Sequence, residues 1–328
     1  MKLKIAILSC LILITMLSVH GLAKTVLVVE SYHAEYPWDI SYKKGLENIL
    51  GKTHELVFFQ MDTKRLPPSR YTRQADLAYR MYEEIQPALV ILGDDNALKY
   101  LGPRLSKTPS PVVYLGINNN PRAYGINPAN MTGVLERPLM KRSIIYMSEL
   151  LAPRLEKLLI LFDSGFTSKT SVREFFNDRN SVNVAGVRVD LKMIAKWTEW
   201  QQTVKNAWKN GYGAIVVGLY QTITDEDGEH VPALKVINWT SKNTPVPPFG
   251  FWDFTVGAEK TIGGLVLFGE SQGEEAGKIA QKILSGKSPA QIPPVIGQKG
   301  RFFFSRSQLE KWQITLPEKI AEKADYTR

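Results

Sequence analysis

The sequence predicts an α/β protein made of two Rossmann-like lobes, each built on a parallel sheet, that meet at a hinge. Two observations favour this fold. Short apolar runs rich in β-branched residues alternate with amphipathic stretches, which is the pattern of parallel strands covered by helices on both faces. The alternation occurs in two successive series within 328 residues, a length that suits two domains.

The first series begins at Thr25. Its apolar runs predict four strands, over residues 25–30, 55–60, 88–92 and 111–115. Helices are expected over 38–50 and between Ser69 and Pro87, with the Ser69 hydroxyl capping the first turn and Pro87 ending the helix. This second helix carries an apolar stripe that we expect to face the sheet, formed by Tyr71, Ala75, Ala78, Tyr82 and Ile85.

The second series repeats the order of strands and helices. Strands are expected over residues 157–162, 182–189, 214–217 and 263–268, and helices over 143–151, 168–176 and 197–209. In the last of these helices the apolar residues recur at helical spacing on one face: Trp197, Trp200, Val204 and Ala207 or Trp208. That spacing predicts that the tryptophans belong to the core and do not contact a ligand.

The first 23 residues have the pattern of a secretory signal peptide. Two lysines are followed by an apolar run from Ile5 to Leu17, and then by small residues at Gly21 and Ala23, the −3 and −1 positions of a cleavage site. We expect removal after Ala23. A retained transmembrane anchor is the alternative, but it would need about 20 apolar residues. No later segment is apolar enough to span a bilayer, so the mature chain is expected outside the cytoplasm without membrane insertion.

Composition and charge exclude several functions. The only cysteine, Cys10, lies in the signal segment, which excludes a disulfide, a cysteine zinc site or a CxxC centre in the mature chain. The net charge falls from +9 to +7 when Lys2 and Lys4 are removed, and the remaining basic residues are scattered among acids, unlike those of a nucleic-acid-binding protein.

Catalytic motifs are also missing from the sequence. It contains no HxxxH or HExxH metal pair and no GxSxG nucleophile motif. We therefore expect no metal, no cofactor and no enzymatic activity. The remaining alternative is a hydrolase that uses two carboxylates, with candidates Asp94, Glu136, Asp163 and Asp253.

Candidate ligand-binding residues follow the ends of the predicted strands. Ligands of parallel sheets bind beyond the carboxyl ends of the strands, so two facing lobes would form a cleft from these loops. A carboxylate such as Asp94 or Asp253 would meet an amine, and Lys64 or free loop N–H groups would meet an acid group. We therefore expect a small polar or zwitterionic ligand with an apolar part. The candidates are Ser31, Tyr32, His33, Trp38, Lys64, Asp94, Asp95, Asn96, Asn118, Asn119, Asp163, Ser164, Tyr220, Trp252 and Asp253.

Some of these polar residues have an alternative role. Asp and Asn at a strand–helix junction commonly cap the following helix. For Asp94, Asp95 and Asn96, capping and ligand contact are both open, and Asp62 with Lys64 and Arg65 could form a local ion-pair turn.

Taken together, these segments resemble a known family along residues 25–324. The sequence is similar to the periplasmic substrate-binding proteins of ABC transporters, in particular the tryptophan/tyrosine-type binding components. It is more similar still to the related sensor domains fused to some bacterial histidine kinases, through residues 31–33, 36–38, 61–65 and 94–98. The features shared with the wider family are residues 130–134, 263–264, 277–280, 283–289, 304–306 and 312–317. The chain departs from the family at Met131, where Val is usual, and at Trp312-Gln313, where Leu-Gly is common.

The resemblance implies a type I periplasmic-binding-protein fold. It implies a first lobe over 24–137 plus about 265–290, and a second over 138–264 plus about 291–328. Crossings between lobes are expected at 132–137 and 249–257, and the helix over 270–285 is expected to pack on the first lobe. The implied function is that of a periplasmic, monomeric binding protein. It would enclose a small-molecule ligand and deliver it to an ABC permease, or act as a ligand-sensing partner of a membrane sensor kinase.

Overall fold

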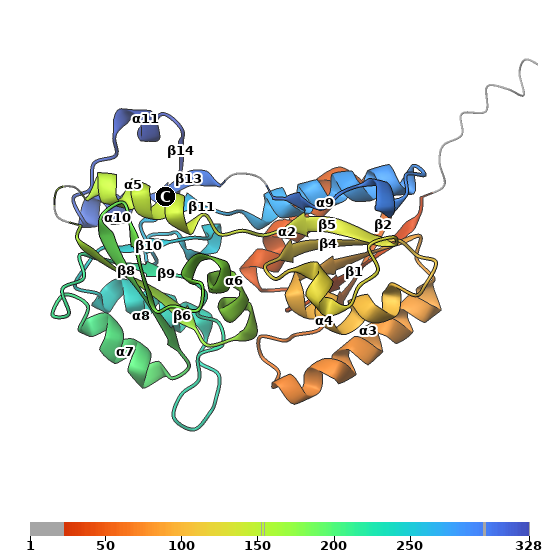
Figure 1. Cartoon of the computed structure of the whole chain (residues 1–328), viewed down its shortest axis with the longest axis horizontal. Helices are drawn as coiled ribbons and strands as arrows, with labels where there is room; N and C mark the ends of the chain where they lie inside the picture. Colours follow the sequence, from red (N-terminus) through yellow and green to blue (C-terminus); the bar gives the residue numbers. More distant parts are fainter. Residues whose placement is uncertain (1–22, 152, 154, 298–299, 328) are drawn as a thin grey trace, which may run out of the picture.

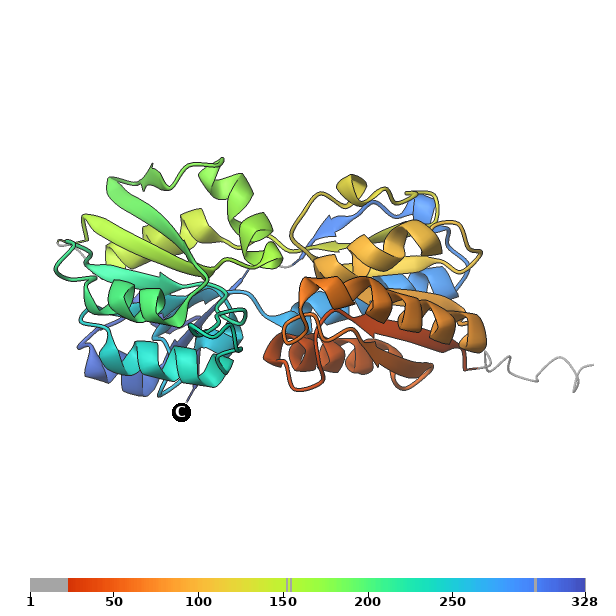
Figure 2. The same cartoon turned by 90° about the horizontal axis from the view of Figure 1, so that it is seen from below.

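The chain forms two α/β lobes arranged along its long axis, joined by a few connecting segments (Figures 1 and 2). The computed structural model describes residues 23–151, 153, 155–297 and 300–327. Nearly all of the signal segment expected over residues 1–23 lies outside the described residues.

The first lobe is built on a fully parallel sheet with the strand order β12-β5-β4-β3-β1-β2. Its central strands are buried along almost their whole length, as their β-branched composition predicts. The strands are β1 (Thr25–Glu30), β2 (Glu55–Gln60), β3 (Leu89–Gly93), β4 (Val112–Ile117), β5 (Met131–Leu135) and β12 (Val295–Ile296).

Helices cover both faces of this sheet. In Figure 1, α9 (Gly269–Leu284) lies above it, and α3 (Tyr71–Ile85) and α4 (Asp94–Leu105) lie below it. α2 (Pro37–Leu50) packs against α9. α9 comes from far along the chain and packs tightly on α2, because Gly273 lies where any side chain would overlap the carbonyl oxygen of Tyr42. The expectation that this helix belongs to the first lobe agrees with this packing.

The second lobe has its own sheet, in the order β10-β9-β6-β8-β7, with only β7 antiparallel to its neighbour. The strands are β6 (Lys157–Asp163), β7 (Ser181–Val184), β8 (Val187–Ile194), β9 (Ala214–Val217) and β10 (Pro248–Gly250). The helices are α5 (Met140–Leu150), α6 (Phe166–Phe176), α7 (Trp197–Lys205) and α8 (Ala233–Asn243). The predicted two-lobe α/β fold with parallel sheets is therefore confirmed.

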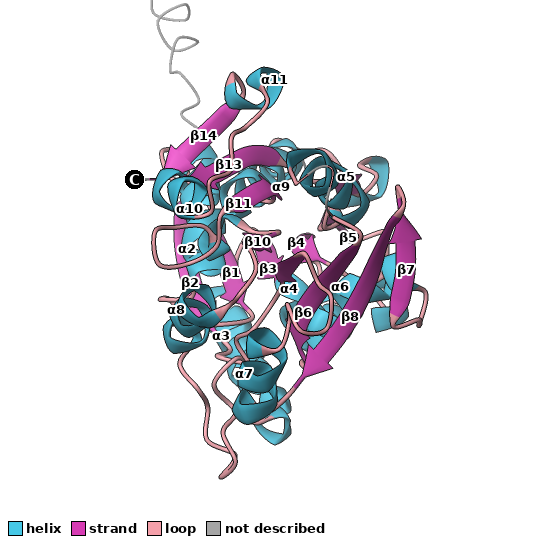
Figure 3. Cartoon of the chain, turned by 90° about the vertical axis from the view of Figure 1, so that its left-hand side faces the viewer, coloured by secondary structure: helices cyan, strands magenta, loops and turns pink. Residues whose placement is uncertain are grey.

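A third, small sheet lies on the second lobe. β11 (Gly263–Val266) pairs antiparallel with β13 (Arg301–Ser305), and β13 pairs parallel with β14 (Ala324–Thr327). Figure 3 shows β13 and β14 beside α10 (Arg306–Lys311), with α11 (Glu318–Ala321) at the far end of β14. The strand predicted over 263–268 therefore exists in shortened form, but it belongs to this sheet and not to the parallel sheet of the second lobe.

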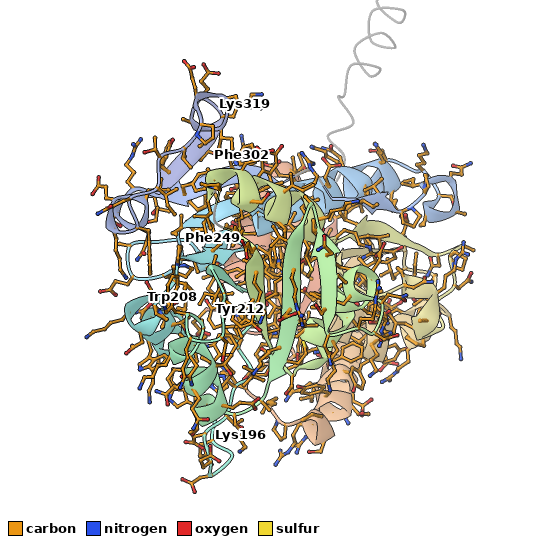
Figure 4. The ribbon with its side chains drawn as sticks, turned by 60° about the vertical axis from the view of Figure 1, so that its left-hand side comes forward. Lys196, Trp208, Tyr212, Phe249, Phe302 and Lys319 are labelled. Carbon is orange, nitrogen blue, oxygen red and sulfur yellow. The ribbon has the colours of Figure 1, made fainter. Side chains whose placement is uncertain are left out.

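Three local predictions are wrong. The single strand expected over 182–189 is a hairpin, because Ala185 and Gly186 both take positive φ angles and turn the chain between β7 and β8. Ser69 does not cap α3: it lies in a 3-10 turn, and the N-cap position is Arg70. Trp208 lies beyond the end of α7 with 70% of its surface exposed, on the outside of the lobe (Figure 4), whereas Trp197 and Trp200 are buried as expected.

The chain passes between the lobes in three places: between β5 and α5, between β11 and α9, and between β12 and β13. The first crossing, over residues 136–139, overlaps only the end of the segment expected over 132–137, because residues 131–135 are themselves strand β5 of the first sheet. The crossing expected over 249–257 is wrong, because β10 pairs with β9 in the second lobe and the chain leaves that lobe only after β11. β12 pairs with β5, so the final return to the second lobe comes after Ile296 and not near residue 291.

Candidate functional site

A small cavity, here called the inner cavity, lies between the lobes at the carboxyl ends of both parallel sheets. Its walls come from loops after β1, β3 and β5 in the first lobe, and from α6 and loops after β9 and β10 in the second. The volume is about 10 Å³, which is room for a single water molecule. The lining residues are Tyr32, Tyr36, Trp38, Asp94, Glu136, Thr167, Leu219, Trp252 and Phe254.

Aromatic rings form most of the inner cavity. The ring centroids of Tyr32 and Tyr36 are 4.6 Å apart, and Tyr36 lies 6.2 Å from Phe254 of the opposite lobe. Phe254 in turn stacks with Trp252 at 6.2 Å and an interplanar angle of 18°. The apolar part of the cavity is therefore shared between the two lobes, and any group between these rings would contact both.

Two polar atoms of the inner cavity are buried without a hydrogen-bond partner among the described residues: Asp94 Oδ2 and Trp38 Nε1. Burying such atoms unpaired costs free energy, so their exposure to one shared cavity indicates a place for a polar group. Burial, together with the nearby carboxyl groups of Asp39, Glu136 and Asp95, raises the pKa of Asp94 well above its usual value.

Glu136 is the second acid of the inner cavity. It follows β5 at the crossing between lobes, and its Oε1 accepts a hydrogen bond of 2.7 Å from Trp252 Nε1. Burial raises the pKa of Glu136 to about 8 in spite of this hydrogen bond. Two buried carboxyl groups that ionise with difficulty would both be stabilised as anions by a cationic group placed between them.

The backbone holds Asp94 in an unusual conformation. Asp94 begins α4 with a φ of 68°, in the left-handed region that Asp tolerates better than most residues. The neighbouring strand makes room for its side chain, because a Cβ at Gly116 would lie only 3.0 Å from Asp94 Oδ1. The carboxyl group is therefore positioned by the ends of β3 and β4 together.

Direct hydrogen bonds join the lobes around the inner cavity. The hydroxyl groups of Tyr32 and Thr167 are 3.2 Å apart, and Ser171 donates to Asn118 Oδ1 at 2.9 Å. On another side, Ser41 donates to Asp253 Oδ2 at 3.3 Å. The lobes are thus in contact, and admitting anything larger than water requires them, or the aromatic side chains, to move apart.

A much larger opening, here called the outer cleft, adjoins the inner cavity at Thr167, which lines both. Its volume is about 800 Å³, within the range of small-molecule sites. The first lobe contributes residues 63–68, Tyr71, Asn96, Lys99 and Tyr100. The second lobe contributes 164–167, Lys169, Thr222, Thr224 and 228–230.

The sequence-predicted site residues divide into several groups. Tyr32, Trp38, Asp94 and Trp252 line the inner cavity, while Lys64, Asn96 and Ser164 line the outer cleft. Asn118 and Asp253 bond the lobes to each other through Ser171 and Ser41. These nine residues therefore lie at the predicted interface between the lobes.

The other predicted residues have partners within the protein. Ser31 Oγ accepts from the Ala97 N–H and donates to the Gly93 carbonyl. Asp95 accepts from the N–H groups of Asn118 and Asn119. The remaining three, Asp163, His33 and Tyr220, lie near the interface without lining either opening. Asp163 accepts hydrogen bonds from the N–H groups of Gly165 and Thr222 and from the Ser168 hydroxyl. His33 Nδ1 lies 3.3 Å from Asp62 Oδ1, and the centroid of the Tyr220 ring lies 6.5 Å from that of Phe254.

Sequence reasoning missed five residues of the inner cavity as ligand contacts: Tyr36, Glu136, Thr167, Leu219 and Phe254. Tyr36, Leu219 and Phe254 lie within two residues of predicted site residues, and Thr167 lies in the first turn of α6. Glu136 is predictable as a site residue only if residues 131–135 are recognised as a strand, because it then follows the carboxyl end of that strand.

Two kinds of feature are absent from the described residues. No helix there is long and apolar enough to cross a membrane. Among the same residues, no group of three or more His, Cys, Asp or Glu side chains is placed to hold a metal ion.

The fold and the cavity between lobes can be compared with known structures. An ABC domain in complex with L-Trp from Streptococcus pneumoniae superposes with a TM-score of 0.68 at 18% identity, covering 93% of this chain and 99% of that one. A conserved domain protein from Vibrio cholerae gives 0.68 at 15% identity, covering 94% and 100%. The ligand-free, open structure of a substrate-binding protein with adhesive properties from Clostridium difficile gives 0.64 at 15% identity, covering 93% and 99%.

These likenesses, with the strand order of the first sheet, establish a type I periplasmic-binding-protein fold. No curated protein sequence matches the chain. The sequence profile of the family described as ABC transporter substrate binding protein matches residues 111–328, about two thirds of the chain. The protein therefore belongs to the ABC transporter substrate binding protein family.

Proposed function

We propose that this protein is a periplasmic solute-binding protein without catalytic activity. It encloses a small polar or zwitterionic solute between its lobes and delivers that solute to an ABC permease. The observation that carries the proposal is the inner cavity, where aromatic rings from both lobes surround the unpartnered Asp94 Oδ2 and Trp38 Nε1. A solute with an apolar ring and an amine matches this combination of surfaces.

The solute acts by changing the balance between open and closed forms. It shifts that balance only through the difference in its affinity for the two forms. Contacts to Tyr36 of the first lobe and Phe254 of the second exist together only when the lobes meet, so they favour the closed form. For a solute bound at micromolar affinity, the total binding free energy is about 8 kcal/mol, of which an aromatic pair contributes about 0.5–1.5 kcal/mol beyond area burial.

The amine of the solute is placed between Asp94 and Glu136 in this proposal. Both carboxyl groups are buried, and burial raises both pKa values, so each gains from a nearby cation. The family relative that was solved with L-Trp makes L-tryptophan and its decarboxylated analogue tryptamine suitable first probes.

The membrane partner distinguishes two versions of this function. The family favours a permease, while the resemblance of residues 31–38 and 61–65 to sensor domains favours a membrane sensor kinase. Permease and ATPase genes beside the gene for this protein would support uptake, and a kinase gene would support sensing. The protein acts as a monomer in either version.

A thermal-shift screen of amino acids, aromatic amines, peptides, sugars and purines tests the proposal. We expect at least one solute to raise the melting temperature and to be recovered chemically unchanged after long incubation. Turnover of the solute would instead support a hydrolase that uses the cleft carboxylates. Trp38→Ala and Asp94→Ala should abolish the shift without unfolding the protein, whereas Trp208→Ala, at an exposed tryptophan, should leave it intact.

A further inference from the structure

The outer cleft carries an excess of positive charge that the inner cavity does not explain. Three of its lysines, Lys64, Lys99 and Lys169, make no ion pair within the described part of the chain. Arg65 also lines the cleft, but its charge is balanced by Asp62 at 2.7 Å. Among the described residues that line the cleft, Glu229 is the single acid.

Lys64 is the unusual member of this group, because only 7% of the residue is exposed. Its ammonium group lies 4.7 Å from the centroid of the Tyr32 ring and 5.6 Å from that of Tyr36, and it makes no hydrogen bond or ion pair with the described residues. A buried ammonium group ordinarily has an anionic or hydrogen-bonding partner. Burial lowers the pKa of Lys64, although the charges of Asp163, Asp94, Asp39 and Glu136 oppose that shift.

A helix N-terminus faces the same cleft. α6 begins at Phe166 after the N-cap residue Gly165, which has no side chain to cap the first turn. The Asp163 carboxylate lies beside this turn, where it accepts from the Gly165 N–H and the Ser168 hydroxyl, and Lys64 and the other two lysines of the cleft offset its charge. The N-terminus of a helix carries partial positive charge and free N–H groups, which favour anions. The Tyr32 ring connects the two features, since it lies under Lys64 and its hydroxyl is 3.2 Å from Thr167 in the first turn of α6.

The flanking lysines come from opposite lobes. Lys99 belongs to α4 of the first lobe, and its ammonium group lies 4.5 Å from the Phe166 ring of the second. Lys169 belongs to α6 of the second lobe. Closure of the lobes therefore gathers like charges around one opening, and an anion bound there would reduce their repulsion.

We propose that the outer cleft contains an anion-binding subsite for a carboxylate or phosphate group, formed by the Lys64 ammonium group and the first turn of α6, with Lys99 and Lys169 at its rim. The anion is either the acid group of the solute held in the inner cavity or a separate organic or inorganic anion. Only the first of these sources rests on the proposed function. In both cases the anion stabilises the closed arrangement of the lobes.

Calorimetric binding measurements with four probes separate the two sources. Inorganic phosphate and benzoate test a free anion. L-tryptophan and tryptamine differ only in the carboxylate, so their comparison tests an acid group that belongs to the enclosed solute. The variants are Lys64→Gln and, at the exposed rim, Lys169→Gln. The matched control is Lys209→Gln, an exposed lysine after α7 that does not line the cleft.

If the anion is free, we expect phosphate or benzoate to bind, with at least tenfold weaker affinity in Lys64→Gln, a smaller loss in Lys169→Gln and no change in Lys209→Gln. If it belongs to the solute, L-tryptophan should bind more tightly than tryptamine, and Lys64→Gln should remove that difference. The proposal is overturned if neither free anion binds and the carboxylate gives no advantage, or if Lys64→Gln and Lys209→Gln behave alike. A further result would separate the two proposals. If tryptamine binding depends on Asp94 but not on Lys64, and neither a free anion nor the carboxylate of L-tryptophan adds affinity, the proposed function stays intact and only this subsite is ruled out.

Discussion

Asp94 and Asp95 are adjacent in the chain, yet their carboxyl groups have opposite surroundings. Asp95 accepts hydrogen bonds from the Asn118 N–H, the Asn119 N–H and the Tyr124 hydroxyl, at 2.9, 3.1 and 2.7 Å. Asp94 Oδ2 is buried, lines the inner cavity and has no hydrogen-bond partner among the residues that the structure describes. One acid holds a loop of the first lobe in place, and the other faces the inner cavity.

We expect Asp95→Asn to destabilise the protein by about 2–4 kcal/mol. The amide nitrogen would face an N–H or O–H donor in place of an acceptor oxygen, which leaves buried groups unpaired. Chemical denaturation measures the change. Unaltered stability would contradict the structural role of Asp95.

We expect Asp94→Asn to have the opposite profile. The free energy of unfolding of the unliganded protein should stay equal or rise, because a buried carboxyl group with a raised pKa is replaced by a neutral group that also tolerates positive φ. Affinity for an amine-bearing solute should fall at least tenfold, since a charge-assisted hydrogen bond is worth about 1.5–3 kcal/mol. Calorimetry on the same preparation gives both the free energy of unfolding and the affinity for the solute. Retained affinity would exclude Asp94 from the site.

Glu136 should make the unliganded protein less stable as pH rises. Its pKa is about 8 in the folded protein and 4.5 in a solvated chain, so its contribution is fully present below pH 4.5 and lost as pH rises through 8. Glu136→Gln should therefore show a smaller loss of stability than the parent protein between these pH values. Parallel curves of unfolding free energy against pH would contradict the raised pKa.

Tyr32 and Thr167 should contribute to closure through their shared hydrogen bond. Tyr32→Phe keeps the ring under Lys64 but removes the hydroxyl, so we expect a cost of about 0.5–1.5 kcal/mol and a roughly 2- to 10-fold weaker solute affinity. Thr167→Val should cost a similar amount. The double variant should be little worse than either single one, because both remove the same bond; additive losses would show that the hydroxyl groups act separately.

The sequence predicts most of the parallel strands, because a buried parallel strand requires an uninterrupted β-branched run such as residues 25–30. The third sheet is not predictable in this way. β11 is a four-residue segment whose Gly263 and Gly264 take φ angles of 105° and 143°, and its partner β13 lies more than 30 residues later. The hairpin between β7 and β8 was hidden because Ala185 is not a typical residue for positive φ.

The position of the inner cavity was predictable, but the surroundings of its acids were not. The rule that ligands bind at the carboxyl ends of parallel strands brings the residues after β1, β3 and β10 together, as the structure has them. Whether Asp94 or Asp95 is satisfied within the protein depends on the loop at 118–119 and on Tyr124, which lie more than 20 residues away. No local pattern contains that information.

The distance between spin labels on the two lobes tests the central claim most directly. Residues 24–328 contain no cysteine, so Arg73→Cys on α3 and Gln202→Cys on α7 would label one exposed site on each lobe, on either side of the outer cleft. We predict a broad distance distribution for the unliganded protein, which narrows and shifts to shorter distances when a stabilising solute such as L-tryptophan is added. The same addition should leave the distribution unchanged in a protein that also carries Asp94→Ala. A distribution that no stabilising solute alters, or one that shifts equally with and without Asp94, would contradict enclosure of a solute between the lobes.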